Sequence, residues 1–417
     1  MVALSTSTAL ASASAGALAE EPERRPMTLE HAIAEGARRG PAVVESYVNR
    51  EAAVAFAQSP GSSLPSTPQL TVLAGARRPY NLPAGPEIAV TVQQELAFRG
   101  LGSARERAAS WALHAASSDV ERARIEGAAT AALAWIDLLE AQGLVDLRRA
   151  AAEDAAKLER IAEVRVTSGA ATALERSLAR AEVGGARVAV LDGEGRATHA
   201  RVTLAHAVGT SMDGAITAEG VLERSRDEAV DTRSVFDALA SHPAVRAAEA
   251  RAAQASAEAS VTRALLGPTM SIGGSAWREG SGDHAAAAIV TLPLPFFDPS
   301  RHDVGRQATI AAAATSHAAR MRSELEREAR LALHEREHTR EVRAELRDAV
   351  VAPLRSATNT AMTAYSAGTS ELGVVLLARR TALAAEERLV TAMADVWRAD
   401  IRLSAIRGTL VATGGSR

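Results

Sequence analysis

One segment of the sequence carries residues that could do hydrolytic chemistry. His334, Glu335 and His338 form the pattern H-E-x-x-H, which on a helix places two imidazoles one turn apart with a carboxylate beside them. Such a pair can hold a zinc ion, and the glutamate can then take a proton from a bound water molecule. Taken alone, the motif predicts a zinc metallopeptidase.

The residues around this motif argue against that enzyme. The stretch from Glu324 to Arg347 is charged on all sides, whereas a catalytic zinc helix needs an apolar side that holds the metal in a dry cleft. Arg336 and Glu337 stand where uncharged residues are expected, and no third ligand follows within reach. We therefore favour a solvated helix face and expect no catalytic residue, no cofactor and no metal site. The metallopeptidase stays as the less favoured alternative.

The elements that carry this segment occur twice in the chain. Residues of about 28–210 return in degenerate form at about 230–410, at an offset of about 200 positions. Pro41 returns as Pro243 and Gly169 returns as Gly368. A repeat of this length indicates one structural unit built from two similar halves.

Each half predicts the same first elements. A helix is expected at about 28–58 and again at about 232–263. Two runs with period-2 alternation then predict a β-hairpin at about 67–98 and another at about 267–298, because turn residues separate the two runs in each half.

A long helix and a shorter return helix follow each hairpin. The long helices are expected at about 103–166 and 304–364, and the first would extend roughly 95 Å. Pro353 is expected to kink the second one. Both should end at a tip glycine, Gly169 or Gly368, with positive φ.

The resulting fold class is mainly α with a small β part, in two tandem structural repeats. Each repeat is a long α-helical coiled-coil hairpin plus a β-hairpin. The expected ranges are 1–26 for a signal peptide or disordered N-terminus, 27–210 for repeat 1 with its tip near 169, 211–230 for an inter-repeat linker, 231–410 for repeat 2 with its tip near 368, and 411–417 for a C-terminal tail.

Composition limits the class of function. The 417 residues carry a formal net charge of −3 and only 3% aromatic residues, and they include no cysteine. The near-neutral charge predicts no nucleic-acid partner, and the missing cysteines exclude disulfides, thiolate metal sites and a catalytic cysteine. Ala17-Leu18-Ala19 resembles a signal cleavage site. No apolar run reaches the length of about 18 residues that a membrane helix needs.

One copy of this chain lacks enough sheet and core to stand alone. Four strands exposed at both sheet edges would invite aggregation, and a helical hairpin of this length has no globular core. Closure of the sheet through oligomerisation into a barrel satisfies both demands. The alternative is a soluble coiled-coil scaffold whose strand-like runs are linkers, but it leaves the recurrence of the alternating hairpins unexplained.

The order of elements and several local segments resemble the TolC-like outer-membrane efflux protein family. The segment from Val90 to Ala109 looks like that family's strand-to-helix turn, and Ile289 to Ala308 is similar to the matching site in the second half. The core PLPFFD at 293–298 looks most like the heavy-metal branch, which exports cobalt, zinc, cadmium or copper ions. Residues 352–383 resemble the family's periplasmic tip.

The resemblance implies a trimeric outer-membrane channel of a tripartite efflux system. Three chains would form a 12-stranded β-barrel in outer-membrane lipid and a 12-helix α-barrel in the periplasm. The implied partners are a periplasmic adaptor (membrane-fusion) protein and an inner-membrane RND-type pump. Solutes, including heavy-metal cations, would pass through without being chemically changed, so the chain is not expected to be an enzyme.

The resemblance also implies positions for the functional residues. The adaptor-contact tip comprises Ser168, Gly169, Ala170, Ala367, Gly368 and Thr369, and Glu175 and Glu371 stand near the expected gate. Gly100, Pro293, Pro295 and Asp298 mark the strand-to-helix turns. In such a channel, His334 and His338 could touch metal ions in transit.

Overall fold

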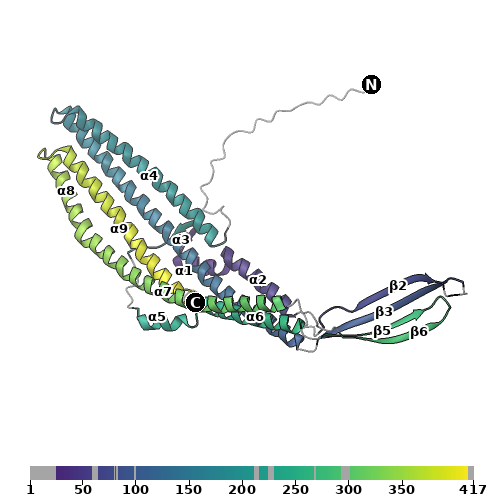
Figure 1. Cartoon of the computed structure of the whole chain (residues 1–417). Helices are drawn as coiled ribbons and strands as arrows, with labels where there is room; N and C mark the ends of the chain where they lie inside the picture. The colour runs from purple at the N-terminus through teal and green to yellow at the C-terminus, as the bar shows by residue number, and fades with distance from the viewer. Residues whose placement is uncertain are drawn as a thin grey trace, which may run out of the picture.

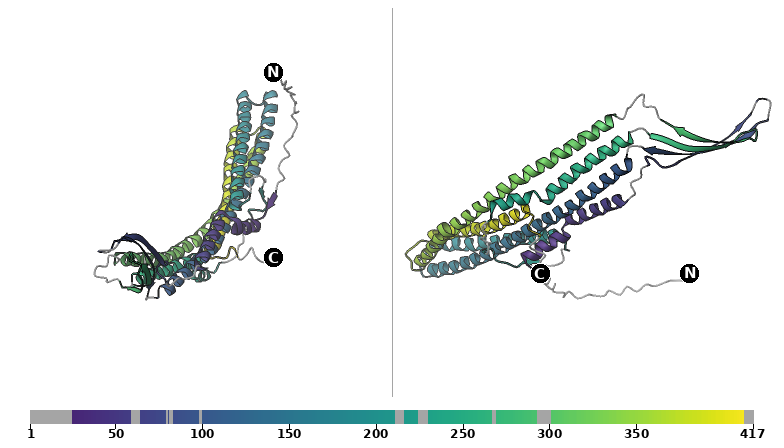
Figure 2. Two further views of the ribbon diagram at one scale, coloured as in Figure 1. Left: turned by 90° about the vertical axis from the view of Figure 1, so that its right-hand side faces the viewer. Right: turned by 90° about the horizontal axis from the view of Figure 1, so that it is seen from below.

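The chain folds into a long helical body with a slender sheet projecting from one end (Figures 1 and 2). The computed structural model describes residues 25–58, 64–78, 80, 83–97, 100–210, 216–223, 230–266, 269–292 and 301–411. Within these residues, helices form most of the structure and strands a small part, as expected for the fold class.

The same order of elements occurs in both halves. The first half contains α1 (Leu29–Arg39), α2 (Pro41–Gln58), β2 (Gln69–Arg77), β3 (Gly85–Ala97), α3 (Leu101–Thr167) and α4 (Ala173–Ala207). The second contains α5 (Thr232–Leu239), α6 (Pro243–Leu265), β5 (Thr269–Arg278), β6 (His284–Thr291), α7 (Arg301–Glu345), the π-helical turn η1 (Leu346–Val351), α8 (Ala352–Ser366) and α9 (Leu372–Ile406).

The opening helix of each half is broken near a proline, where the sequence predicted one continuous helix. Pro41 begins α2, and Pro243 begins α6. Proline lacks the N–H that a continuing helix requires, but it fits well in the first turn of a new one. His242 caps α6, because its side chain accepts a hydrogen bond from the Ala244 N–H at 3.2 Å.

A small parallel sheet joins the segment before α1 to the segment between the two halves. Strand β1 (Arg25–Met27) pairs with β4 (Ile216–Ala218), so Arg25 and Pro26 belong to the folded body and the predicted linker contains a strand. The Trp135 indole N–H donates to the Met27 carbonyl at 2.7 Å. Segments of three residues give no periodic signal, and tertiary contacts fix them here.

The second long helix is interrupted just before Pro353. The Ala352 N–H donates to the Arg347 carbonyl, five residues earlier, which closes the π-helical turn η1. Since Pro353 has no N–H and its ring crowds the preceding turn, a wider turn accommodates it. The expected kink therefore takes the form of a π-helical insertion between α7 and α8.

The main core lies where the helices cross in the middle of the body. It is rich in alanine from α3, together with Trp135, Ile136 and Leu138, and it includes side chains from α1, α4 and α9. Small residues let helix backbones approach closely. Among the described residues, α3 is the one helix that is long and apolar enough to cross a membrane. Its most apolar 18-residue window has a mean hydropathy of 1.2, and half of that window is buried in the body. The sequence reading missed this window, because alanine dilutes its apolar character.

Candidate functional site

The projecting sheet has four strands in the order β2-β3-β5-β6, and all neighbours are antiparallel. The central pair joins the two halves of the chain, with Ile88 opposite Arg278 and Ala97 opposite Thr269. Among the described residues, β2 and β6 have no further strand on their outer sides. Their backbone N–H and C=O groups therefore form two open edges that a further strand could fill.

The two faces of this sheet differ in chemistry. Because side chains alternate along each strand and opposite residues share a face, the register assigns every strand residue to one face. The apolar face carries Leu70, Val72, Ala74, Ile88, Val90, Val92, Ile272, Ala276, Ala286, Ala288 and Val290, with Gln94, Arg278 and His284 on the same face toward its two ends.

The opposite face carries hydroxyl, amide and carboxylate groups. Its polar members include Thr71, Glu87, Thr91, Gln93, Ser271, Ser275 and Thr291, and Leu73, Trp277 and Ile289 share this face. The Thr91 and Ser275 hydroxyls lie 2.8 Å apart and share a hydrogen bond. On β3 and β5 this polar face is the more sheltered one, while the apolar face is exposed. Sheltered polar groups and exposed apolar groups are the reverse of what a water-soluble sheet requires.

The two helical tips lie at the opposite end of the body from the sheet (Figure 1). The six predicted tip residues are all exposed. Gly169 has φ +74° and Gly368 has φ +82°, as expected for residues that end a helix. Thr172 caps α4, and its side chain accepts from the Glu175 N–H at 3.4 Å.

Three side chains join the tip of one helical hairpin to the tip of the other. We call Arg165, Tyr365 and Glu175 the tip lock. The Tyr365 hydroxyl donates to Glu175 Oε2 at 3.0 Å. The Arg165 guanidinium donates to the Tyr365 carbonyl and lies 4.5 Å from the centre of its ring. These contacts link α3 and α4 to the end of α8.

The Tyr365 side chain is fully buried among apolar residues at the tip. Leu158, Ala162, Ala179, Leu372, Val375 and Leu376 surround it. Burial and the hydrogen bond to Glu175 raise the pKa of Tyr365 to about 12. The phenol therefore remains a neutral hydrogen-bond donor throughout the physiological range.

The remaining predicted site residues do not converge with the tip lock. Glu371 is the exposed residue before α9, and its side chain makes no capping hydrogen bond. Gly100 precedes α3 with φ +63°, at the turn from β3 into the helix. Pro293, Pro295 and Asp298 lie outside the described residues.

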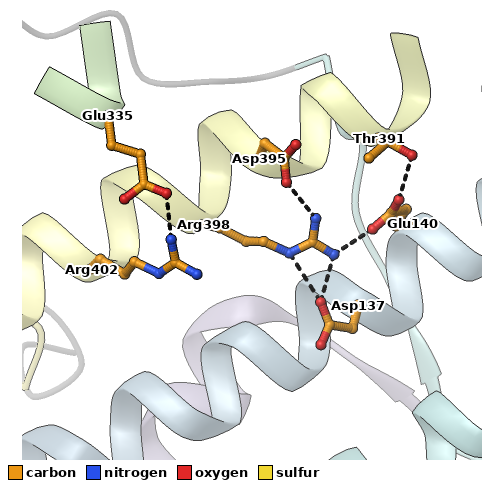
Figure 3. A network of polar contacts seen from close by, with 7 residues as sticks. All are labelled: Asp137, Glu140, Glu335, Thr391, Asp395, Arg398 and Arg402. Carbon is orange, nitrogen blue, oxygen red and sulfur yellow. Dashed lines mark hydrogen bonds and ion pairs between the residues drawn. The ribbon is translucent and has the colours of Figure 1, made fainter. Parts of the chain in front are cut away.

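Two residues inside the H-E-x-x-H segment, Glu335 and Arg336, form ion pairs between α7 and α9. Glu335 pairs with Arg402 at 2.5 Å (Figure 3), and Arg336 pairs with Asp400 at 2.6 Å. No group of three histidine or acidic side chains in the described part of the chain could hold a metal ion. The glutamate that a peptidase would use as its base thus serves as a helix-to-helix contact.

A second ionic cluster joins α9 to α3. Arg398 binds Asp137 at 2.6 Å and Asp395 at 2.8 Å, and it also binds Glu140 (Figure 3). Burial alone would lower the pKa of Arg398, but the hydrogen bonds to Asp137 and Glu140 outweigh it and raise the pKa. Thr391 donates to the other oxygen of Glu140 at 2.7 Å.

Sequence reasoning named Glu175 near the expected gate, and Tyr365 lies within the segment 352–383 that resembles the family's tip. It did not bring these two residues together, and it missed Arg165 and Arg398. One signal was available for the tip. At the offset of 199 that relates Gly169 to Gly368, Arg165 matches Ala364 and Glu175 matches Val374. The tip lock therefore uses positions where the two halves differ chemically.

Comparison with known proteins gives one family match and several solved structures of the same fold. Residues 235–409 match the family Outer membrane efflux protein. No curated protein sequence matches the chain. The outer membrane protein VceC from Vibrio cholerae shares the fold with a TM-score of 0.72 and 21% identity, over 91% of this chain and 96% of VceC.

Two further solved channels have the same fold. The outer membrane channel CmeC from Campylobacter jejuni aligns with a TM-score of 0.75 and 16% identity, over 91% of this chain and 85% of CmeC. The open state of the outer membrane channel MtrE from Neisseria gonorrhoeae aligns with a TM-score of 0.74 and 17% identity, over 92% of this chain and 89% of MtrE.

These findings favour a channel over both alternatives, the metallopeptidase and the soluble scaffold. The family sequence covers the second half, including the H-E-x-x-H segment, and the channel fold covers nearly the whole chain. The chain therefore has the fold of solved outer-membrane channels, and its second half matches the sequence family of outer membrane efflux proteins.

Proposed function

We propose that three copies of this chain close into one duct, with each chain supplying two tandem repeats of the same unit. Four strands from each chain would give a 12-stranded barrel, and the long helices would give a 12-helix barrel below it. The observation that carries this proposal is the sheet, whose two edges are open and whose apolar face is the exposed one. A barrel embedded in lipid removes both problems, because closure pairs every edge group and lipid covers the apolar face.

The helical body supports the same assembly. Helix α4 exposes a row of large apolar side chains along its length, namely Leu174, Leu178, Val188, Leu191 and Val202. Near the tip of α9, Val374 and Leu377 are also exposed, the latter by 70%. Steps of four, ten, three and eleven residues keep the α4 side chains within one broad side of the helix, which suits packing against a neighbouring helix.

In this assembly the chain conducts solutes passively. The polar, sheltered face of the sheet would line the water-filled barrel, and no enclosed binding site for the solute is needed. The driving force would come from an inner-membrane RND-type pump through a periplasmic adaptor. The exposed tips, Ser168-Gly169-Ala170 and Ala367-Gly368-Thr369, are the proposed adaptor contacts, since they lie farthest from the sheet.

We further propose that the tip lock holds the periplasmic end of the duct closed. Opening requires the return helices α4 and α9 to move relative to the long helices, a two-state change that adaptor docking would bias. Such a movement would break the contact between Tyr365 and Glu175, which joins the two hairpins. Glu371 has no such partner among the described residues and would face the opening as a free carboxylate.

The exported solute is proposed to be a heavy-metal cation, on the sequence resemblance at residues 293–298 alone. A strain that lacks this gene would then gain sensitivity to cobalt, zinc, cadmium or copper salts, and the intact gene would restore tolerance. Sensitivity to organic compounds with unchanged metal tolerance would refute this choice of solute and leave the duct itself intact.

The mass of the purified assembly tests the duct. In mild detergent, sedimentation or native mass spectrometry should give a protein mass three times the 43.4 kDa of one chain. A single 43.4 kDa species that persists at high protein concentration would refute the assembly.

A further inference from the structure

Two imidazoles lie exposed on α7 and have no role in the duct described above. Of the ten histidines in the chain, only His334 and His338 are three or four positions apart. Their rings are nearly parallel, at 17°, and the ring centres lie 6.1 Å apart. Within the described part of the chain, neither ring takes part in a hydrogen bond or an ion pair, so both are free to rotate.

Near His334, one side of α7 packs against α9 and the other side is exposed. Glu335 and Arg336 face α9 and pair with Arg402 and Asp400. His334, His338 and Glu341 follow one another at helical spacings of four and three, which places them together on the exposed side. The ion pairs therefore fix the helix, while the histidine side remains open to water.

We propose that His334 and His338 together chelate one divalent transition-metal cation. Both rings must turn so that one nitrogen of each reaches the metal at about 2.0–2.1 Å, and exposed, unbonded side chains can do so at little cost. Water fills the remaining positions, with the Glu341 carboxylate one turn further along. Imidazole ligands suit copper, nickel and zinc, and the general order of affinities puts copper first.

The charges on the exposed side favour a cation there. Glu337 and Glu341 are exposed beside the histidines and make no ion pair with another described residue. Two carboxylates beside two imidazoles attract a dication from solution, and the Arg330 guanidinium, one turn before His334, lies against the Phe236 ring instead. This site does not depend on the proposed duct, because both ligands come from one helix of one chain.

Binding of Cu²⁺ alone to the full-length, tag-free protein in detergent tests the proposal. Equilibrium dialysis should show one site per chain that weakens about 100-fold in the His338→Ala variant, since the second ligand of a chelate acts at high effective concentration. Electron paramagnetic resonance of the bound Cu²⁺ should show two coordinating nitrogens in the wild type and one in the variant.

A matched control separates this pair from histidines in general. His317 is also exposed on α7 and has no histidine within four positions, so His317→Ala should bind Cu²⁺ as the wild type does. In a His334→Ala background, Glu341→His should restore two-nitrogen binding, because it recreates a pair with His338.

Three results would overturn the proposal. They are equal binding by the wild type and His338→Ala, an equal loss in His317→Ala, and a one-nitrogen spectrum in the wild type. Helix content from circular dichroism confirms that each variant is folded. A protein that proves monomeric but keeps the two-nitrogen site would refute the duct and leave the metal site standing.

Discussion

Replacement of Tyr365 by phenylalanine isolates one contact of the tip lock. The change removes the hydroxyl that donates to Glu175 at 3.0 Å. It keeps the ring beneath the Arg165 guanidinium and leaves the Tyr365 backbone carbonyl available to Arg165. The buried apolar contacts around the ring also remain, so packing is unchanged.

The expected cost follows from the kind of bond that is lost. A hydrogen bond to a charged group contributes about 1.5–3 kcal/mol, but Glu175 is only half-buried, so water can replace part of the interaction. We expect a loss of about 1 kcal/mol in the local stability of the tip, which corresponds to about a fivefold change in an equilibrium constant.

Hydrogen exchange measures this local equilibrium directly. Amides in residues 166–178 and 362–376 should exchange about five times faster in Tyr365→Phe, while amides in the main core should be unaffected. In planar bilayers the same variant should spend more time open, since the contact holds the proposed closed state together.

Tyr47→Phe provides the matched control. Tyr47 lies 41% exposed on α2, remote from the tip. Its replacement also removes one phenol hydroxyl, but it leaves the tip lock intact. Unchanged tip exchange in Tyr365→Phe, or an equal acceleration in Tyr47→Phe, would refute the reasoning.

Four further outcomes are expected. In an alkaline absorbance titration, one tyrosine should ionise only near pH 12, and this ionisation step should be absent in Tyr365→Phe. Because the neutral phenol is favoured by folding, its contribution is present below about pH 10 and lost as the pH rises through about 12. Arg398→Met should lower the free energy of unfolding by about 2 kcal/mol, measured by denaturant titration, since Glu140 and its acidic neighbours lose their cation in a partly exposed setting. Burial lowers the pKa of His242, so the unfolded state binds the extra proton first and stability should fall as the pH drops below about 6.5, an effect absent in His242→Asn. Gly169→Ala should speed amide exchange at the tip, because a left-handed φ costs a side-chain-bearing residue about 1–2 kcal/mol even where space is open.

The sequence predicted the long-range plan of the fold because that plan has strong periodic signals. The alternation of apolar Val90 and Val92 with polar Thr91 and Gln93 predicts a strand, whichever strand it pairs with. Gly169 and Gly368 end helices because glycine readily adopts a positive φ. The order of the elements and their open-edged sheet could therefore be inferred before any coordinates.

Features that depend on contacts between distant segments could not be read in this way. Met27 lies in a three-residue strand that is held by Trp135 from another helix. Tyr365 and Glu175 are 190 positions apart, and only the packing of two hairpin tips brings them together. The H-E-x-x-H motif shows the converse, since its glutamate is recognisable in sequence while its partner Arg402 is supplied by the fold.

Cross-linking of the two open sheet edges tests the central claim most directly. The chain has no cysteine, so any disulfide must come from introduced cysteines. Three variants each combine one cysteine on β2, at Leu70, Val72 or Ala74, with Ala288→Cys on β6. These residues lie on one face of the sheet, on strands at opposite edges. Oxidation in the outer membrane should produce disulfide-linked chains that end at the trimer for at least one combination. Exclusively uncross-linked chains for every combination, or a ladder that ends at the dimer, would contradict a three-chain barrel.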